Sequence, residues 1–218
     1  MNAKSTTLLI LTGVLFVSIR LAVAEGGITT KFDVREGPQP IATSDSNVGR
    51  LIPDLEFTPV SGKKFRLSTY KSAPAVVIAF TSTSCPVTKR YAPTLATIEK
   101  QYSARGVKFI FVNAIAADAS TDITAAIRTH GFTGPYVRDT RGEIAASLDA
   151  HSTAEVFVLD AARTLVYRGA VDDQYGLGYS QDAPKSRYLA AALDALLAGR
   201  QPPVAATTAP GCARCAQL

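Results

Sequence analysis

The stretch that decides the fold runs from residue 75 to residue 93 and reads AVVIAF-TSTS-CPVTKRYAP. Residues 75–80 are a continuous apolar run, rich in β-branched side chains, which predicts a strand buried on both faces. From residue 86 to residue 102 the apolar side chains recur every three or four positions, which predicts a helix with one buried face. The polar TSTS loop therefore delivers Cys85 to a helix start, where Pro86 is favourable because its φ angle is already helical.

Hydrophobic patterning on either side of this stretch predicts the remaining elements. We expect a hairpin at 55–58 and 65–67, a strand at 107–112, helices at 122–129 and 142–148, paired strands at 156–159 and 165–167, and a helix at 187–197. Parallel strands linked by a helix and followed by an antiparallel pair predict an α/β fold. Its mixed β-sheet is flanked by helices, and the early hairpin forms an N-terminal extension.

The first 24 residues have the pattern of a signal peptide. Lys4 precedes the apolar run of residues 7–19, and Ala22 and Ala24 place small residues before a cleavage point. An uncleaved anchor is the alternative, although the run is short for a span of roughly 20 residues. Export would place the protein outside the cytoplasm, in the periplasm for example, where cysteines can pair.

Composition limits the remaining domain organisation and the classes of partner. The 218 residues are 47% hydrophobic with a net charge of +5, which excludes disorder as the main state. Loss of residues 1–24 lowers this charge to +3 by removing Lys4 and Arg20, too little to indicate nucleic-acid binding. We expect an extended lead-in at 25–47, one domain at 48–198 and a flexible tail at 199–218, which is rich in Pro, Ala and Thr at first and ends in a cysteine pair.

Cys85 is the candidate nucleophile. A helix N-terminus stabilises a thiolate and lowers its pKa, and we expect the Thr88 hydroxyl to hydrogen bond to the sulfur across one turn. Lys89 and Arg90 add positive charge nearby. A buried cysteine that only packs is the alternative reading.

Several motifs together resemble the redoxin branch of the thioredoxin superfamily, which includes alkyl hydroperoxide reductases and thiol-specific antioxidant proteins. They are residues 48–71, the run CPVTKRYAP at 85–93, the EVFVLD strand at 155–160 and YRG at 167–169. Pro93 follows Cys85 by eight residues, where thioredoxins carry a helix-kinking proline. The similarity spans about residues 48–198. It implies a thioredoxin-like fold and a redox-active Cys85 acting on disulfides or hydroperoxides without a cofactor or metal.

The sequence departs from the superfamily pattern at three places. Thr88 replaces the second cysteine of the C-x-x-C motif, so Cys85 lacks its usual pairing partner. Ser82 can stand for the Thr or Ser of the peroxiredoxin signature, but Ile78 occupies the position of its Pro. The loop that carries a cis-proline in the family reads STAE at 152–155, with Ala154 at the proline position, so we expect a trans bond there. By the resemblance, Ser82, Thr153 and Ala154 belong to the substrate loops that face Cys85.

The tail cysteines Cys212 and Cys215 offer a replacement for the missing thiol. As a flexible coil the tail spans roughly 20 Å, enough for either sulfur to return to Cys85. One of them would then resolve an oxidised Cys85. A local Cys212–Cys215 disulfide, or binding of a metal or partner, are the alternatives, although two ligands are few for structural zinc.

Other polar residues have weaker patterns. His151 is an acid–base candidate or a solvated loop residue, and His130 is expected as a cation at a helix end. Asp172 and Asp173 can pair with Arg168 or form a polar turn.

Two functional classes follow. The first is an exported thiol oxidoreductase acting on a thiol or disulfide protein partner or a hydroperoxide. The second is a non-catalytic thioredoxin-like module that binds a metal or docks to a redox partner. Membrane contact is expected only through an uncleaved N-terminal segment.

Overall fold

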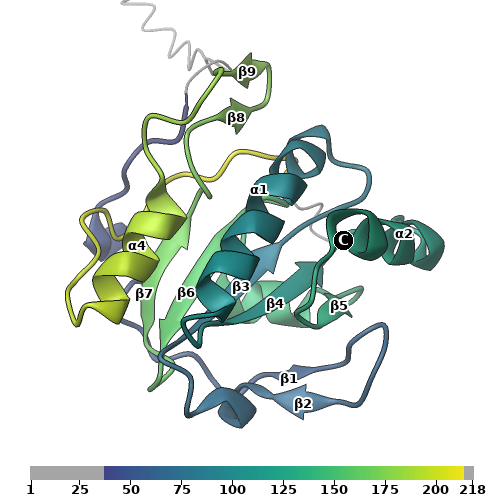
Figure 1. The fold of residues 1–218 in the computed structure, drawn as a ribbon, viewed down its shortest axis with the longest axis horizontal. Coiled ribbons are helices and arrows are strands. Elements are labelled where there is room, and N and C mark those ends of the chain that lie inside the picture. Colours follow the sequence, from purple (N-terminus) through teal and green to yellow (C-terminus); the bar gives the residue numbers. More distant parts are fainter. Residues whose placement is uncertain (1–36, 214–218) are drawn as a thin grey trace, which may run out of the picture. The chain divides into compact units, whose positions relative to one another are not determined.

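The computed structural model describes residues 37–213, so the predicted signal peptide, most of the lead-in and Cys215 lie outside the described residues. A five-stranded mixed sheet forms the centre, in the order β5-β4-β3-β6-β7 (Figure 1). Its strands are β3 (Ala75–Phe80), β4 (Lys108–Asn113), β5 (Tyr136–Arg138), β6 (Val156–Asp160) and β7 (Leu165–Gly169). Strands β3, β4 and β5 are parallel, whereas β6 and β7 run antiparallel to their neighbours, which confirms the predicted mixed sheet.

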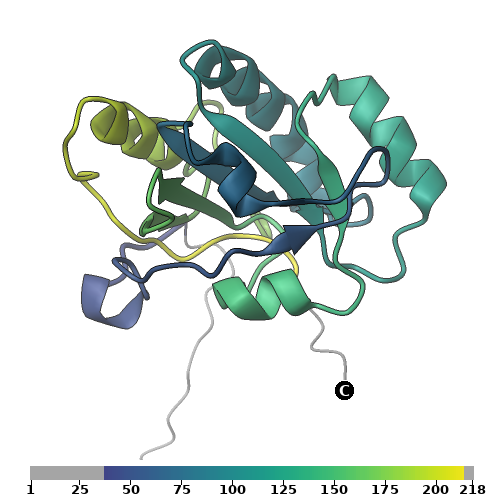
Figure 2. The ribbon, with the colours of Figure 1, turned by 90° about the horizontal axis from the view of Figure 1, so that it is seen from below.

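Helices cover both faces of this sheet. They are α1 (Pro86–Ser103), α2 (Ser120–His130), α3 (Glu143–Leu148) and α4 (Tyr188–Leu197). Figure 2 shows α1 and α4 on one face and α3 on the other. Alternation along the strands explains this arrangement, because Val77 of β3 packs in the cluster of α1 and α4, while its neighbour Ile78 packs with α3.

Short elements complete the fold. The expected early hairpin is present as β1 (Glu56–Phe57) and β2 (Phe65–Arg66), paired antiparallel. A second small hairpin, β8 (Tyr175–Gly176) and β9 (Tyr179–Ser180), and the edge strand β5 were not predicted. Each of these strands has only two or three residues, too few for a periodic pattern to be visible.

The segment after α4 differs from the flexible tail expected from its composition. We call residues 205–213 the C-terminal strap. The Arg168 amide donates to Ala205 O at 3.2 Å, and the Thr207 amide donates to Arg168 O at 3.1 Å, so the strap lies along the edge of β7. On its other side the Ile41 amide donates to Ala206 O at 2.9 Å. The expectation of flexibility is therefore wrong for residues 205–213, because hydrogen bonds to β7 at one end and to the 152–153 loop at the other, which composition does not reveal, hold the backbone.

Within residues 37–213 there is no helix long and apolar enough to cross a membrane.

Candidate active site

The loop between β3 and α1 is held by a buried carboxylate. Asp118 Oδ2 accepts hydrogen bonds from the Ser82 hydroxyl at 2.8 Å, the Thr83 amide at 2.7 Å and the Asn113 side chain at 2.7 Å. Burial raises the pKa of Asp118, but hydrogen bonds, including those from Ser84 and Asn113, lower it more, so the group stays ionised. Ser82 Oγ in turn accepts the Cys85 amide at 3.2 Å, which fixes Cys85 as the N-cap residue of α1.

The Cys85 thiol lies against the thiol of Cys212. Cys212 Sγ donates to Cys85 Sγ at 2.9 Å, and no disulfide bond joins them. Burial raises the pKa of Cys85, but hydrogen bonds lower it to about 7, those of the Cys212 thiol and the Thr153 side chain first. A thiol with that pKa is substantially ionised near neutral pH.

Cys85 is buried in the structure. The residue is only 2% exposed, because it lies in the apolar cluster of α1 and α4, and Cys212 of the strap packs against this cluster. The sulfur nevertheless contacts a second thiol and hydrogen-bond donors, so it does not merely pack against apolar groups.

The expected role of the Thr88 hydroxyl is wrong. This hydroxyl binds two backbone carbonyls instead, Ser82 O at 2.7 Å and Cys85 O at 3.0 Å. Thr88 acts on the sulfur through its backbone, whose hydrogen bond is one of the contributions that lower the pKa of Cys85. The backbone N–H groups of a first helical turn have no partner within the helix, which leaves this one available to the sulfur.

The loop at residues 152–155 binds backbone atoms at the end of the strap. The Thr153 amide donates to Cys212 O at 3.1 Å, and the Cys212 amide donates to Thr153 Oγ1 at 3.2 Å. The Ser152 hydroxyl donates to Pro210 O at 2.6 Å, and Ser152 pairs antiparallel with Ala213. Peptide bonds are trans throughout residues 37–213, including the one before Ala154. The loop therefore holds Cys212 as part of a short extended segment.

A buried ion pair supports this loop. Arg168 Nη2 lies 2.6 Å from Glu155 Oε1, and the two side chains are only 5% and 4% exposed. Glu155 Oε2 accepts the His151 amide at 2.8 Å, and Arg168 Nη2 donates to Asp149 O at 2.6 Å. The pair thus joins β7, which carries the strap, to the loop that binds Cys212.

Comparison with known proteins identifies the family. The family model described as Redoxin matches residues 47–183. The chain belongs to the redoxin family. No curated protein matches this redoxin.

Solved structures agree on the fold of the redoxin. A hypothetical protein from Sinorhizobium meliloti is similar with a TM-score of 0.69 and 25% identity, covering 82% of this chain and 97% of that chain. An uncharacterized conserved protein from Geobacillus kaustophilus has a TM-score of 0.68 and 27% identity, with 82% and 95% covered. The peroxidoxin BcpB from Mycobacterium tuberculosis, at 19% identity and a TM-score of 0.54, covers 70% of this chain and 97% of its own, and shares the fold.

Sequence reasoning missed the partner of Arg168. Of the two alternatives for Asp172 and Asp173, the structure shows the polar turn and not the pairing with Arg168: Asp172 accepts the Gln174 amide, and Asp173 accepts the amides of residues 185 and 186. Glu155 lies just before β6 and 13 residues from Arg168, and the antiparallel pairing of β6 with β7 brings the two side chains together. A charged residue in an otherwise apolar strand was the available signal, because such residues are buried only when paired.

The two histidines lie at the surface. The side chain of His151 is 72% exposed, with Nε2 3.5 Å from Asp149 Oδ2, which fits a solvated loop residue. His130 is the last residue of α2, so its predicted position at a helix end is confirmed. Within residues 37–213, no three His, Cys, Asp or Glu side chains are grouped to hold a metal ion.

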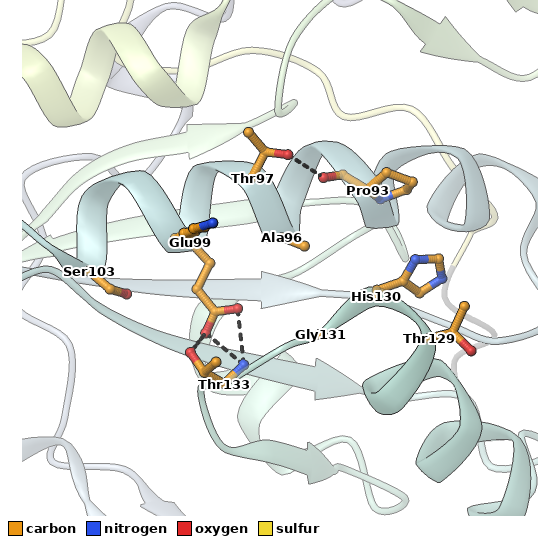
Figure 3. A pocket seen from close by; sticks show the side chains of 10 residues that line it. Pro93, Ala96, Thr97, Glu99, Ser103, Thr129, His130, Gly131 and Thr133 are labelled. Atoms are coloured by element: carbon orange, nitrogen blue, oxygen red, sulfur yellow. Dashed lines mark hydrogen bonds between the residues drawn. The ribbon is translucent and has the colours of Figure 1, made fainter.

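A separate cavity of about 710 Å³ lies between α1 and the end of α2 (Figure 3). The carboxylate of Glu99 points from α1 to the turn after α2, where it accepts the Thr133 hydroxyl at 2.8 Å and the Gly134 amide at 2.5 Å. Its hydrogen bonds fasten α1 to that turn, so the acid has a structural role in the cavity wall.

Proposed function

We propose that this redoxin is an exported thiol–disulfide oxidoreductase in which Cys85 is the nucleophile and Cys212 the resolving thiol. One observation carries the proposal: the two sulfurs lie 2.9 Å apart, on a helix start and a strap separated by 127 residues in the sequence. Hydrogen bonds hold both the loop that carries Cys85 and the strap that carries Cys212. The pKa of Cys85, about 7, makes its thiolate available near neutral pH.

The reaction follows from this geometry in two exchanges. The Cys85 thiolate attacks one sulfur of a substrate disulfide, forming a mixed disulfide and releasing the other substrate sulfur as a thiolate that takes up a proton. The Cys212 thiolate then attacks Cys85 Sγ, forming the Cys85–Cys212 disulfide and releasing the second substrate thiolate. Two electrons pass from the protein dithiol to the substrate, and a reducing dithiol protein restores the starting form.

Hydrogen bonding around Cys85 favours disulfides over hydroperoxides. Reduction of a peroxide requires donors for the oxygen atoms as the O–O bond breaks. The hydroxyls of Thr88 and Ser82 both donate elsewhere, to backbone carbonyls and to Asp118, and the Thr153 hydroxyl, which hydrogen bonds to the Cys85 sulfur, is the side-chain hydroxyl left beside it. Peroxide reduction is therefore expected to be slower than disulfide exchange.

Substrate entry requires the strap to move. An incoming sulfur must align with Cys85 Sγ, and Cys212 Sγ occupies that neighbourhood. Residues 210–213 are held by hydrogen bonds from the Ser152 and Thr153 loop and not by a strand of the central sheet, so this part of the strap can separate without unfolding the sheet. The same contacts then return Cys212 for the second exchange.

Export rests on the signal-peptide pattern of residues 7–24, and an oxidising compartment suits a protein that cycles between dithiol and disulfide. The expected partners are thiol or disulfide proteins of that compartment.

The test is to trap the disulfides formed when the reduced full chain meets oxidised glutathione or hydrogen peroxide. Mass mapping after alkylation should find a Cys85–Cys212 bridge in the wild type and in Cys215→Ser, formed faster with glutathione disulfide. In Cys212→Ser the reaction should stop at glutathione joined to Cys85. Absence of both products would favour a binding module without thiol chemistry, and a Cys85–Cys215 bridge would remove Cys212 from the resolving role.

A further inference from the structure

We propose that Thr207 and Gly169 are positioning residues for Cys212, because their contact anchors the strap at a fixed distance from Cys85. This inference rests on the proposed resolving role of Cys212. Neither residue touches a cysteine in the described contacts, and their effect is transmitted through the strap.

Thr207 is a buried polar residue at the edge of the sheet. It is 1% exposed, and its Oγ1 accepts the Ala170 amide at 2.9 Å. The hydroxyl of Tyr167 lies 3.4 Å from the same oxygen. On the backbone, the Thr207 amide donates to Arg168 O at 3.1 Å. The side chain and the main chain of one residue thus fasten the strap to β7.

Gly169 makes room for this anchor. Its φ angle is +135°, a conformation that residues with side chains rarely adopt. A Cβ atom on Gly169 would lie 2.6 Å from Thr207 O and would also overlap Thr207 Oγ1. The sheet edge therefore accepts the strap at this point only because residue 169 has no side chain.

The anchor shortens the tether that carries the resolving thiol. From the end of α4 at Leu197, fifteen residues lead to Cys212, whereas five lead there from Thr207. Because effective concentration falls roughly as the −3/2 power of tether length, anchoring at Thr207 alone raises it about fivefold. Thr208, one residue nearer to Cys212, adds a second attachment of the strap, since its amide donates to Gln39 O at 2.8 Å.

The experiment measures the effective concentration of Cys212 toward Cys85. Full-length protein carrying Cys215→Ser is equilibrated in glutathione buffers of graded ratio, and the Cys85–Cys212 disulfide is quantified after acid quenching. Thr207→Val keeps the shape but removes the acceptor, and should lower the effective concentration by more than twofold, toward the limit of about fivefold for a fully released tether. Thr207→Ser keeps the hydroxyl and should remain within about twofold of the parent, and Gly169→Ala should lower the value further than Thr207→Val.

The outcomes separate this inference from the proposed function. Thr207→Val within twofold of the parent would overturn the positioning role, whether or not Gly169→Ala folds. If the parent itself forms no Cys85–Cys212 disulfide, the proposed function fails and this inference fails with it. Thermal unfolding measured on the same samples gives the folded fraction of each variant. A general loss of stability is thereby separated from a change in the effective concentration of Cys212.

Discussion

Replacement of Cys212 by Ala should raise the pKa of Cys85. Burial raises this pKa, and the hydrogen bond from Cys212 is the largest of the contributions that bring it down to about 7. A hydrogen bond to a charged acceptor is worth about 1.5 kcal/mol at the lower end. Since about 1.4 kcal/mol is a tenfold change in an ionisation constant, the thiolate fraction of Cys85 near pH 6 should fall about tenfold.

The measurement is the pH dependence of alkylation at Cys85, followed peptide by peptide by mass spectrometry in the Cys215→Ser background. The midpoint pH reports ionisation, whereas the plateau rate reports access, so removal of the Cys212 side chain does not confuse the two. Cys212→Ser is the matched control, because its hydroxyl can still donate to the thiolate and should keep the midpoint nearer to that of the parent. A Cys212→Ala midpoint equal to the parent's or below it would refute the assignment of the low pKa to the thiol pair.

Three further predictions concern the surroundings of the pair. Glu155→Gln leaves the buried Arg168 guanidinium with only the half-exposed Asp149 carboxylate, 3.5 Å from Nη1, as its counter-charge. It should lower the free energy of unfolding in urea by about 3 kcal/mol, against less than about 1 kcal/mol for Asp194→Asn, which breaks an exposed ion pair with Arg105. Folding lowers the pKa of Cys85 to about 7. The Cys85 thiolate therefore contributes fully to the stability of the folded protein only above the pKa of an unfolded thiol, and this contribution is lost as pH falls through about 7. From alkaline to mildly acidic pH, the free energy of unfolding of the reduced protein should therefore fall by about 2 kcal/mol more than that of Cys85→Ser. Gly211→Ala would bring a Cβ within 2.6 Å of Ser152 Oγ at a φ of +129°, so the strap should loosen and the plateau alkylation rate of Cys85 should rise roughly tenfold; an unchanged rate would show that the strap does not limit access.

The elements that the sequence predicts well are those whose own residues determine them. The apolar run of β3 and the spacing along α1 locate both elements, and the polar loop between them places Cys85 at the helix start. For the Thr88 hydroxyl the sequence predicts the wrong acceptor, because it gives the turn of the helix but not the choice between the sulfur and the Ser82 and Cys85 carbonyls.

Long-range contacts account for what the sequence does not show. The strap buries little beyond Ala206 and Thr207, so no hydrophobic period marks it, and its order comes from backbone bonds to β7 and to the 152–153 loop. Likewise, the Glu155–Arg168 pair depends on strand register. From tether length alone, either tail cysteine can reach Cys85. In the structure Cys212 is in contact with Cys85, while Cys215 lies outside the described residues.

The position of the second thiol has a mechanistic consequence. In a C-x-x-C helix both sulfurs belong to one rigid element, so the resolving thiol cannot withdraw. In this redoxin position 88 carries a threonine whose hydroxyl closes the first turn of α1, and the second sulfur belongs to a strap with an anchored end near Thr207 and a lightly held end at residues 210–213. In the proposed mechanism one movement of the strap both uncovers Cys85 and withdraws the second thiol, so a variant that loosens the strap should speed the first exchange while slowing the second.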